Sequence, residues 1–476
     1  MRSSVRHLGL ALALLGPELA AQGCPLATPC HDFTAIDAEM QALVASAARS
    51  GANLSIGRAG QSLFRRSYGG FDLATQVPIA SATKWLSAAV ILALVDDGVL
   101  DLDAPVSRWL PQFTGLKGTM TVRQMFSHTS GLPGQDPSIS DDRITLAQAV
   151  DHIAANVPLR AAPGAEFFYG GVSMHVAGRV AEVVAGLGWA ELFLAKVAVP
   201  LGMTGTDYLG IGSASNPRIA GGARSTLGDY ERFMEMIEGR GLFRGRRVLS
   251  AAAVDLMVQD QTRGAIPVSV PPTVDVFRGY GIGCWMERID AQGRSLEVSS
   301  PGAFGFSGIL DLERGTHAVF LVQSLNQRTD PFFDSVRELI RGQLRFRGIE
   351  CFGGSSPACE GALRMRTTTA PLSGETAFAL RCDHVPALGG GVCLVGPSAA
   401  IPPLPVLGVE IHVALGPVTI AEPVFAGPDG FVALPIPLTT VLPGTLAFAQ
   451  FVMVPNASCP APLPFATSHA LAITVR

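Results

Sequence analysis

The chain has 476 residues, more than one ordinary domain needs, so two globular domains are expected, each able to bury a core without metal ions or disulfides. Its 35 basic and 39 acidic residues give a formal net charge of -4, and no long run carries a single sign. This balance argues against a nucleic-acid partner.

The first 21 residues have the pattern of a secretory signal peptide. Two arginines precede an apolar stretch over residues 8–15, and small residues close the segment. A membrane-spanning helix needs about 20 apolar residues in a row, whereas Pro17 and Glu18 interrupt this stretch. We therefore expect a protein without a transmembrane segment that is exported to the periplasm, the cell surface or the medium. A lipid anchor at Cys24 is a lesser alternative.

The eight cysteines suit an oxidising destination, because all except Cys284 lie near the two ends of the chain. Cys284 lies in a strand-like run and is expected to be a buried thiol. Three local disulfides are plausible among the many connectivities that eight cysteines allow: Cys24 with Cys30, Cys351 with Cys359, and Cys382 with Cys393. No cysteine or histidine spacing is typical of a zinc site, so neither a metal nor another cofactor is predicted.

Hydrophobic periodicity predicts an α+β domain over residues 22–348 and a different domain over residues 349–476. Strand-like runs lie at 53–57, 62–68, 279–287, 295–299, 304–312 and 317–323. Helices are expected at 81–97, 172–185 and 332–344. This order predicts one antiparallel sheet that is closed by the two ends of the domain and flanked by helices. An inserted helical lobe completes the domain, with a cleft between sheet and lobe.

Residues 349–476 carry few charges, many prolines and about seven short strand-like runs, such as 409–415 and 446–454. Short strands separated by turns are typical of an all-β sandwich. The C-terminal domain is therefore expected to be one.

Ser81-Ala82-Thr83-Lys84 opens an apolar helix, and the spacing of three places the Ser81 and Lys84 side chains on one face of its first turn. A lysine can take the proton of a serine nucleophile if burial lowers its pKa. The alternative is an N-cap serine followed by a solvated lysine. Only three of the 35 basic residues are lysines, and the chain otherwise uses arginine, which cannot act as a base. This bias favours the catalytic interpretation.

Two further segments could complete such a site. In Phe168-Tyr169-Gly170-Gly171 the phenol of Tyr169 could relay a proton, although a tyrosine beside a phenylalanine is more often part of a core. Ser300-Pro301-Gly302-Ala303 lies between two strand runs. It could aim a backbone N–H at an oxyanion, or it could be a plain hairpin turn.

Taken in order, these motifs resemble those of the serine β-lactamase and penicillin-recognising family, in the class C branch that includes many esterases. The resemblance covers roughly residues 51–344 and also rests on the segments 79–84, 101–106, 126–132, 200–203 and 221–226. It implies that Ser81 is acylated, that Lys84 and Tyr169 share the proton transfers, and that the N–H groups of Ser81 and Ala303 form the oxyanion hole. It places His128, Gly171, Ser300 and Gly302 around the substrate pocket, with His128 in a structural role.

Two departures from the family pattern narrow the range of expected substrates. The family's Tyr-x-Asn is Tyr169-Gly170-Gly171 here, so the amide that helps to hold the acyl group is absent. The family's Lys-Thr-Gly or His-x-Gly is Ser300-Pro301-Gly302, which lacks the cation that usually receives a substrate carboxylate. The sequence therefore predicts an exported serine hydrolase that forms an acyl-enzyme on Ser81 and acts on small neutral esters or amides.

Other functions are weighed against this one. A D,D-peptidase or β-lactamase would need another cation for the substrate carboxylate, and Arg224 and Arg288 are the candidates. A non-catalytic protein would act through its C-terminal domain, for example by contact with the cell surface. An α/β-hydrolase is disfavoured because the sequence lacks a Gly-x-Ser-x-Gly motif, to which Gly305-Phe306-Ser307-Gly308 comes nearest.

Overall fold

The computed structural model describes residues 31–48, 50–358, 361–457 and 463–476. The predicted signal peptide, residues 1–21, lies outside this set. The chain divides into two compact units, one of residues 33–340 and one of residues 341–476 with residues 31 and 32. The division lies near the end of helix α12 (Asn326–Gln343), slightly before the expected boundary at residue 348.

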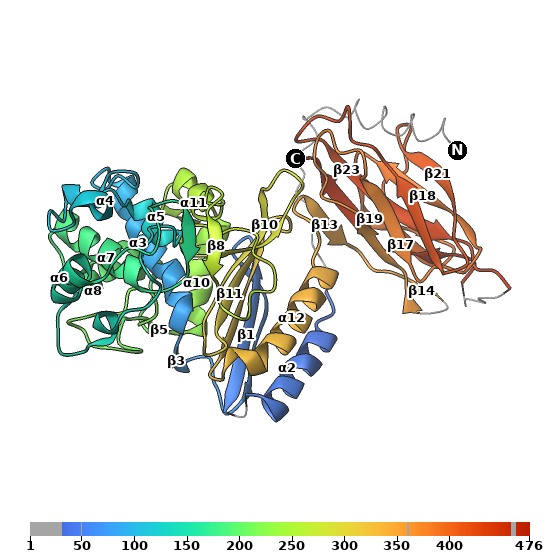
Figure 1. The fold of residues 1–476 in the computed structure, drawn as a ribbon. Helices are drawn as coiled ribbons and strands as arrows, with labels where there is room; N and C mark the ends of the chain where they lie inside the picture. Colours follow the sequence, from blue (N-terminus) through green and yellow to red (C-terminus); the bar gives the residue numbers. More distant parts are fainter. Residues whose placement is uncertain (1–30, 49, 359–360, 458–462) are drawn as a thin grey trace. The chain divides into compact units, whose positions relative to one another are not determined.

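A six-stranded antiparallel sheet forms the centre of the first unit, as predicted (Figure 1). The strand order is β2 (Gln61–Gly69), β1 (Gly51–Arg58), β12 (Thr316–Val322), β11 (Ser307–Asp311), β10 (Ser295–Pro301) and β9 (Trp285–Ile289). The first and last of these strands in the sequence, β1 and β12, are neighbours, with Ala52 opposite Val322. The strand expected at 279–287 is wrong over its first half, because the chain turns at Gly279 and Gly283, which both have positive φ.

Helices cover both faces of this sheet (Figure 1). Helices α2 (Thr34–Ser46) and α12 lie on one face, where the rings of Phe320 and Phe333 are 5.3 Å apart. Helix α10 (Leu227–Glu238) packs on the other face. Helix α12 begins six residues before the expected start at 332, because it continues through Pro331. Burial of Phe333 against the sheet compensates for the hydrogen bond that proline cannot donate.

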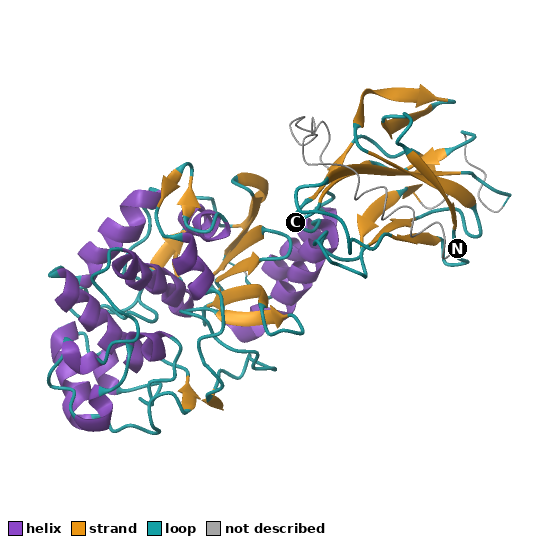
Figure 2. Ribbon diagram, turned by 90° about the horizontal axis from the view of Figure 1, so that it is seen from above, coloured by secondary structure: helices purple, strands orange, loops and turns teal. Residues whose placement is uncertain are grey.

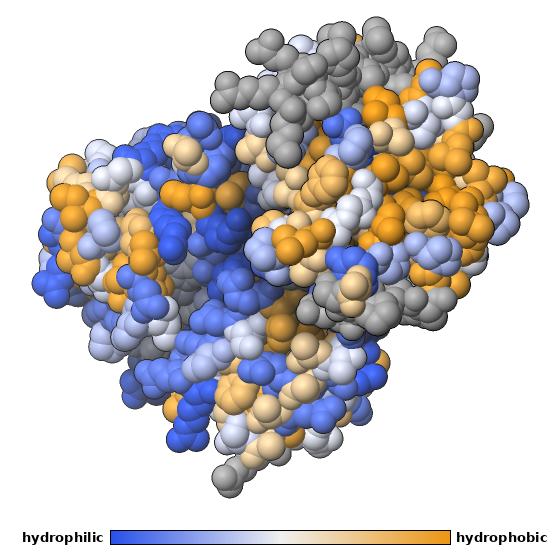
Figure 3. Space-filling model, turned by 90° about the vertical axis from the view of Figure 1, so that its right-hand side faces the viewer, coloured by the Kyte–Doolittle hydropathy of each residue, from blue (hydrophilic) through white to orange (hydrophobic). Residues whose placement is uncertain are grey.

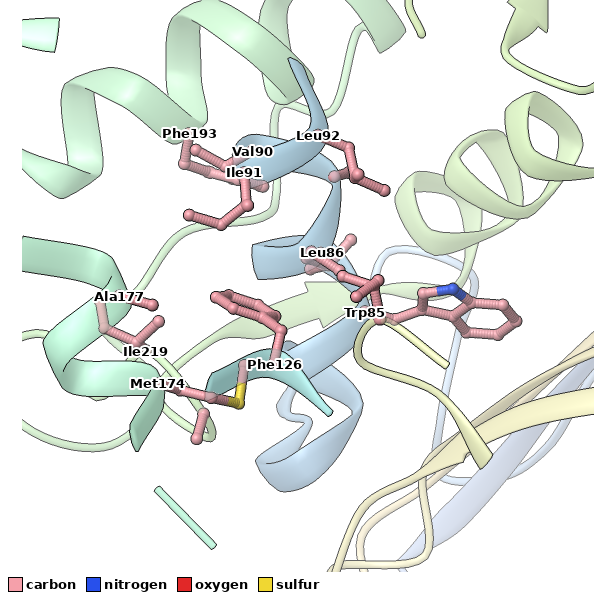
Figure 4. Packing of buried hydrophobic residues seen from close by; sticks show 14 of the residues in the cluster. Trp85, Leu86, Val90, Ile91, Leu92, Phe126, Met174, Ala177, Phe193 and Ile219 are labelled. Carbon is pink, nitrogen blue, oxygen red and sulfur yellow. The ribbon is translucent and has the colours of Figure 1, made fainter. Parts of the chain in front are cut away.

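The inserted lobe is helical (Figure 2), and its helices pack around α3 (Thr83–Asp96). Every residue of α3 from Thr83 to Leu94 is buried, so its hydrophobic residues point in all directions. Figure 4 shows Leu86 and Ile91 of α3 among Phe126, Met174 and Ile219 from other elements. A 3₁₀ turn, Ala80–Ala82, precedes α3, so the α-helix begins two residues later than expected. The helix expected at 172–185 is confirmed as α7 (Val172–Ala185).

Within the part of the chain that the structure describes, no single helix is long and apolar enough to cross a membrane. One pair, Val172–Ala185 with Trp189–Leu201, passes that test when taken together across a bend of 77°.

From β13 (Ile349–Phe352) onward the described residues form strands and loops (Figure 2). The larger sheet contains β13, β25 (Ala470–Thr474), β23 (Leu446–Met453), β18 (Gly390–Gly396) and β21 (Ile420–Phe425) in this order. A second sheet contains β16 (Arg364–Thr367), β17 (Ala379–Asp383) and β22 (Phe431–Pro435). Leu380, Cys393 and Phe451 from the two sheets share one buried cluster, so the expected sandwich is confirmed.

A hairpin of β19 (Ala399–Val406) and β20 (Val409–Val413) adds a further layer to the C-terminal unit. Ile411 and Val413 are buried against Leu394 and Phe448 of the larger sheet. The unit also exposes large apolar side chains, and Figure 3 shows hydrophobic residues gathered over it.

The cysteine pairing differs from the expectation. Cys382 and Cys393 are both free and buried, so the expected bond between them is wrong. They lie on β17 and β18, one in each sheet of the sandwich, and both belong to the buried cluster between the sheets as free thiols. Cys351 is disulfide-bonded, while Cys24, Cys30 and Cys359 lie outside the described residues. Cys284 is a free, buried thiol, as predicted.

Candidate active site

Ser81 lies in the 3₁₀ turn that leads into α3 and is partly exposed at the base of a cleft. The residue before it, Ala80, has a φ of +44°, a left-handed conformation that is uncommon for a residue with a side chain. Such strain is found mainly where the surrounding structure holds a functional residue in place. The local backbone therefore presents the Ser81 hydroxyl at the start of a rigid, buried helix.

Lys84 lies one turn after Ser81 and is only 3% exposed. Its Nζ atom donates to the Ser81 Oγ atom at 3.1 Å and to the carbonyl oxygen of Ala220 at 2.9 Å. Burial disfavours the ammonium form and lowers the pKa of Lys84 to about 7. Near neutral pH a large fraction of Lys84 is therefore uncharged and able to accept the Ser81 proton. The solvated-lysine alternative is excluded by the burial.

Tyr169 follows the short strand β4 (Glu166–Phe168) and lines the same cleft as Ser81. The Nζ atom of Lys84 lies 4.6 Å from the centroid of the Tyr169 ring, so the three predicted catalytic side chains are together. Burial raises the pKa of Tyr169 to about 12, and hydrogen bonding to Ser81 and Trp285 acts in the opposite direction. Tyr169 therefore remains a neutral phenol that can donate and accept a proton in turn.

The Gly302-Ala303 turn passes close to the segment before Ser81. A Cβ atom added to Gly302 would lie 2.1 Å from the carbonyl oxygen of Ile79, so only glycine allows this approach. Ala303 is exposed in the cleft. Among the described residues, its backbone N–H has no hydrogen-bond partner, as a donor reserved for a substrate oxygen requires.

The other predicted pocket residues, His128, Gly171, Ser300 and Gly302, are all buried, and none of them lines the cleft. Three of them adjoin residues that do: His128 packs on Tyr169, Ser300 is bonded to the Ser81 carbonyl, and Gly302 precedes Ala303. The Ser300 hydroxyl donates to the carbonyl oxygens of Ser81 at 3.4 Å and Gly283 at 3.3 Å.

His128 is 1% exposed, and its ring lies 4.8 Å from that of Tyr169. It packs against Phe167 and Tyr280 as well, at 5.6 and 4.9 Å between ring centroids. Burial, together with the nearby charge of Lys84, lowers the pKa of His128 well below 6.5. In this environment His128 is a neutral packing residue beneath Tyr169.

The cleft has a volume of about 440 Å³. Ser81 and Tyr169 line it together with four other segments: the loop 271–278, the start of β9 at 285–287, the turn at 301–303, and residues 326–337 of α12. Sequence reasoning missed Trp285, Asp330 and Arg337, because no local motif marks them. The ring of Trp285 lies 4.9 Å from that of Tyr169 and forms part of an aromatic wall.

Arg224 and Arg288, the sequence candidates for binding a substrate carboxylate, do not line the cleft. Arg224 is bonded to both carboxylate oxygens of Asp207, at 2.9 and 3.0 Å. Arg288 donates to Glu313 at 2.8 Å. As for metals, no group of three or more His, Cys, Asp or Glu residues within the described segments is placed to hold an ion.

Comparison with known proteins places the site in a family context. A family model described as Beta-lactamase matches residues 36–340. Esterase EstB of Burkholderia gladioli is 32% identical over 208 residues, which make up 37% of this chain and 53% of EstB. The D-alanyl-D-alanine-carboxypeptidase/endopeptidase AmpH of Escherichia coli is 25% identical over 260 residues, 49% of this chain and 66% of AmpH. The chain thus spans about half to two thirds of the length of these relatives.

Solved structures share the fold of the first unit. A candidate beta-lactamase from Bacteroides dorei is 32% identical, with a TM-score of 0.60, and the match covers 66% of this chain and 99% of that one. EstCE1, a hydrolase with promiscuous acyltransferase activity, is 20% identical, with a TM-score of 0.55 and coverage of 64% and 97%. At this lower identity the likeness concerns the fold alone.

Proposed function

The chain belongs to the beta-lactamase family, and from that premise we propose that it is an exported serine hydrolase that cleaves small esters or amides without a carboxylate, through an acyl-enzyme on Ser81. The observation that carries this proposal is the contact of a buried, low-pKa lysine with a serine hydroxyl, 3.1 Å apart. A lysine with these properties is a general base rather than a surface charge.

Acylation begins with transfer of the Ser81 hydroxyl proton to Lys84. The Ser81 oxygen attacks the substrate carbonyl carbon, and the carbonyl oxygen takes the negative charge of the tetrahedral intermediate. The N–H groups of Ser81 and Ala303 donate to that oxygen. The proton then passes through Tyr169 to the leaving alcohol or amine as its bond to the carbonyl carbon breaks.

Deacylation reverses the same proton path with water as the nucleophile. Water gives a proton to the Tyr169 and Lys84 pair and attacks the acyl carbon, and Ser81 leaves with a proton returned to its oxygen. No bound group other than the substrate is needed for these steps. Substrate choice then depends on the walls of the cleft.

A substrate without a carboxylate is supported by the groups near Ser81. Ser300 occupies the position where the family has a cation, and its hydroxyl donates to two backbone carbonyl oxygens. Arg224 and Arg288 are paired with carboxylates elsewhere. The names of EstB and EstCE1 make an esterase-like activity reasonable for this chain as well.

Export and the role of the C-terminal unit belong to the same proposal. The signal-like residues 1–21 support export, and the exposed apolar side chains of the C-terminal unit support a contact at the cell surface. Fractionation of the producing cells, with N-terminal sequencing of the mature protein, tests both the cleavage and the destination.

A fluorophosphonate probe tests the activity directly. We expect mass spectrometry to place the adduct on Ser81 and expect Ser81→Ala to abolish labelling. The same protein is then tested with short acyl esters, a chromogenic cephalosporin and D-amino-acid amides. Efficient turnover of the cephalosporin would favour the β-lactamase alternative, and absence of labelling in folded protein would favour a non-catalytic one.

A further inference from the structure

Asp330 is a partly buried carboxylate in the catalytic cleft, and none of the described residues pairs with it. It lies in α12, one helical turn after Asn326, and lines the cleft together with Ser81. Among the described residues, neither a hydrogen bond nor an ion pair stabilises its charge. Partly buried carboxylates are normally paired, because loss of hydration is unfavourable for the ionised form. An unpaired one beside a nucleophile points to a partner on the substrate.

The start of α12 is attached to the turn that carries the predicted oxyanion donor. The backbone N–H of Asn326 donates to the carbonyl oxygen of Ala303 at 3.2 Å. A Cβ atom added to Gly305 would lie 2.9 Å from the Thr329 hydroxyl, so this turn and α12 are in close contact. Asp330 follows Thr329, and one helical turn rises only about 5.4 Å. A substrate that binds at Ala303 therefore lies beside the first turns of α12.

Arg337, the cation of α12 that lines the cleft, is already paired with carboxylates of the protein. Its guanidinium donates to Glu287 at 3.1 Å and to Glu297 at 2.5 Å, and it lies 3.4 Å from an oxygen of Asp334. Three carboxylates thus share this guanidinium, and Asp330 is not among them. Of the residues of α12 and β9 that line the cleft, Glu287, Asp330 and Asp334 are acidic and Arg337 is basic, so this wall carries a net negative charge.

The remaining charges of the cleft do not offset this excess. On the loop 271–278, Asp275 and Arg278 carry opposite charges and are both exposed. Lys84 lies beneath Ser81 and is bonded to Ser81 and Ala220. The pKa of Asp330 is raised to about 6 by burial and by the negative charges of Asp334 and Glu287, which is the effect expected of a carboxylate that lacks a cation.

We propose that Asp330 is the counter-ion for a positively charged group of the substrate, so that the enzyme prefers esters or amides that carry an ammonium group. This inference rests on the proposed hydrolase function and refines it: the expected substrate has no carboxylate, but it is cationic rather than neutral. Asp330 acts in recognition and touches the substrate away from the reacting carbonyl.

Two pairs of isosteric substrates test the preference. In the first pair, choline butyrate is compared with the ester in which a tert-butyl group replaces the trimethylammonium group. In the second pair, p-nitrophenyl esters carry the same two groups at the end of the acyl chain. We expect kcat/KM for the cationic member to exceed that of its isostere by about tenfold or more in at least one pair, since the Coulombic attraction between opposite charges in a partly buried site contributes at least this much.

Substitutions of Asp330 test whether this residue causes the preference for the cationic substrate. We expect Asp330→Asn to reduce the ratio of the two kcat/KM values to near one, Asp330→Glu to restore part of it, and Asp330→Lys to reverse it. Glu338→Gln is the matched control, because Glu338 is exposed on the same helix and does not line the cleft. It removes the same charge and should leave the ratio within about twofold.

A thermal melt separates recognition from a structural role. Because its folded-state pKa is raised, ionised Asp330 destabilises the fold at neutral pH, so Asp330→Asn should melt at or above the wild-type temperature. Hydrolysis of all four esters without a cationic preference would overturn the inference and leave the proposed function intact. Failure to hydrolyse any of them, together with no fluorophosphonate labelling, would overturn both. A preference that survives Asp330→Asn would also refute the assignment.

Discussion

A Cβ atom added to Gly171 would lie 2.8 Å from the Cδ1 atom of Ile139. Ile139 is 8% exposed and fills the space beside Ala220, whose carbonyl oxygen accepts a hydrogen bond from Lys84. The position where the family has an asparagine therefore has no room for one here. The same packing holds the backbone carbonyl of Ala220 against the Lys84 ammonium group.

We expect Gly171→Asn to destabilise the protein by about 1–3 kcal/mol, because a side chain inserted into a packed site forces its neighbours to move. Ile139→Val removes the Cδ1 methyl group and should itself cost about 0.5–1.5 kcal/mol. In the double variant the two effects should partly cancel. Denaturant unfolding of the four proteins checks this, and simple additivity would show that the two positions do not interact.

Lys84→Met should abolish turnover and fluorophosphonate labelling, because the base for the Ser81 proton is lost. General-base catalysis is typically worth roughly 10² to 10⁴ in rate. The same variant should be more stable by about 1–4 kcal/mol, since it replaces a buried cation with an apolar side chain. Ester hydrolysis and thermal melts of one sample provide both readouts.

The gain in stability of Lys84→Met should depend on pH. The pKa of Lys84 is about 7 in the folded protein, against 10.5 for an unperturbed lysine, so the unfolded chain binds the proton more tightly. The loss of folding stability caused by the buried ammonium group is therefore fully present below about pH 7, and it decreases as the pH rises toward 10.5. A Lys84→Met variant that melts well below the wild type at pH 6 would contradict the prediction that the buried ammonium group destabilises the folded protein.

Lys84→Arg is the control that keeps a positive charge. A guanidinium cannot accept the Ser81 proton, and it must remain charged in a site that is 3% exposed. We expect loss of turnover and a lower melting temperature, in contrast to the methionine variant. An arginine variant that retains most of the ester hydrolysis would rule out Lys84 as the base and leave Tyr169 to be tested.

The rate of ester hydrolysis should rise with pH through about 7. The active form has a neutral Lys84, whose pKa is lowered to about 7, whereas Tyr169, with a pKa of about 12, remains protonated throughout. A plot of kcat/KM for an uncharged ester should therefore show one acid limb near pH 7 and a plateau from about pH 8 to 10. An acid limb near pH 4, or no limb between pH 5 and 9, would point to another base.

Truncation after Gly348 should leave an active hydrolase. Residues 33–340 form one compact unit, and β13, the first strand of the C-terminal sandwich, begins at Ile349. All the described residues that line the catalytic cleft lie between Ser81 and Arg337. We expect kcat within about threefold of the full chain, measured with a short acyl ester. A truncated protein that is folded by circular dichroism yet inactive would show that the C-terminal unit contributes to catalysis.

The closed sheet, the helical lobe and the C-terminal sandwich could be predicted from periodicity, because each strand or helix has a strong pattern of its own. Ser81, Lys84 and Tyr169 could be predicted from their motifs, and the structure brings them together. The start of α12 at Asn326 could not be predicted from the sequence. Pro331 favours a later start, and only tertiary packing against the sheet overrides that preference.

The residues of the cleft wall depend on chain segments that are distant in the sequence. Trp285 belongs to the site because the chain turns at Gly283, and Asp330 belongs to it because α12 packs against the turn at Ala303. Neither relation leaves a local sequence signal. The short spacing of Cys382 and Cys393 is likewise a poor guide to pairing, because both are free thiols on strands of different sheets.

The pairing of β1 with β12 also determines when the first unit can fold. Ala52 lies opposite Val322 in the middle of the sheet, so the central ladder cannot form until nearly all of the unit has left the ribosome. Until then β1 has β2 as its neighbour but lacks the strand on its other side. Closing so long a loop is entropically slow. A nascent chain that ends before residue 316 therefore remains open, with the hydrophobic side chains of β1 accessible to chaperones.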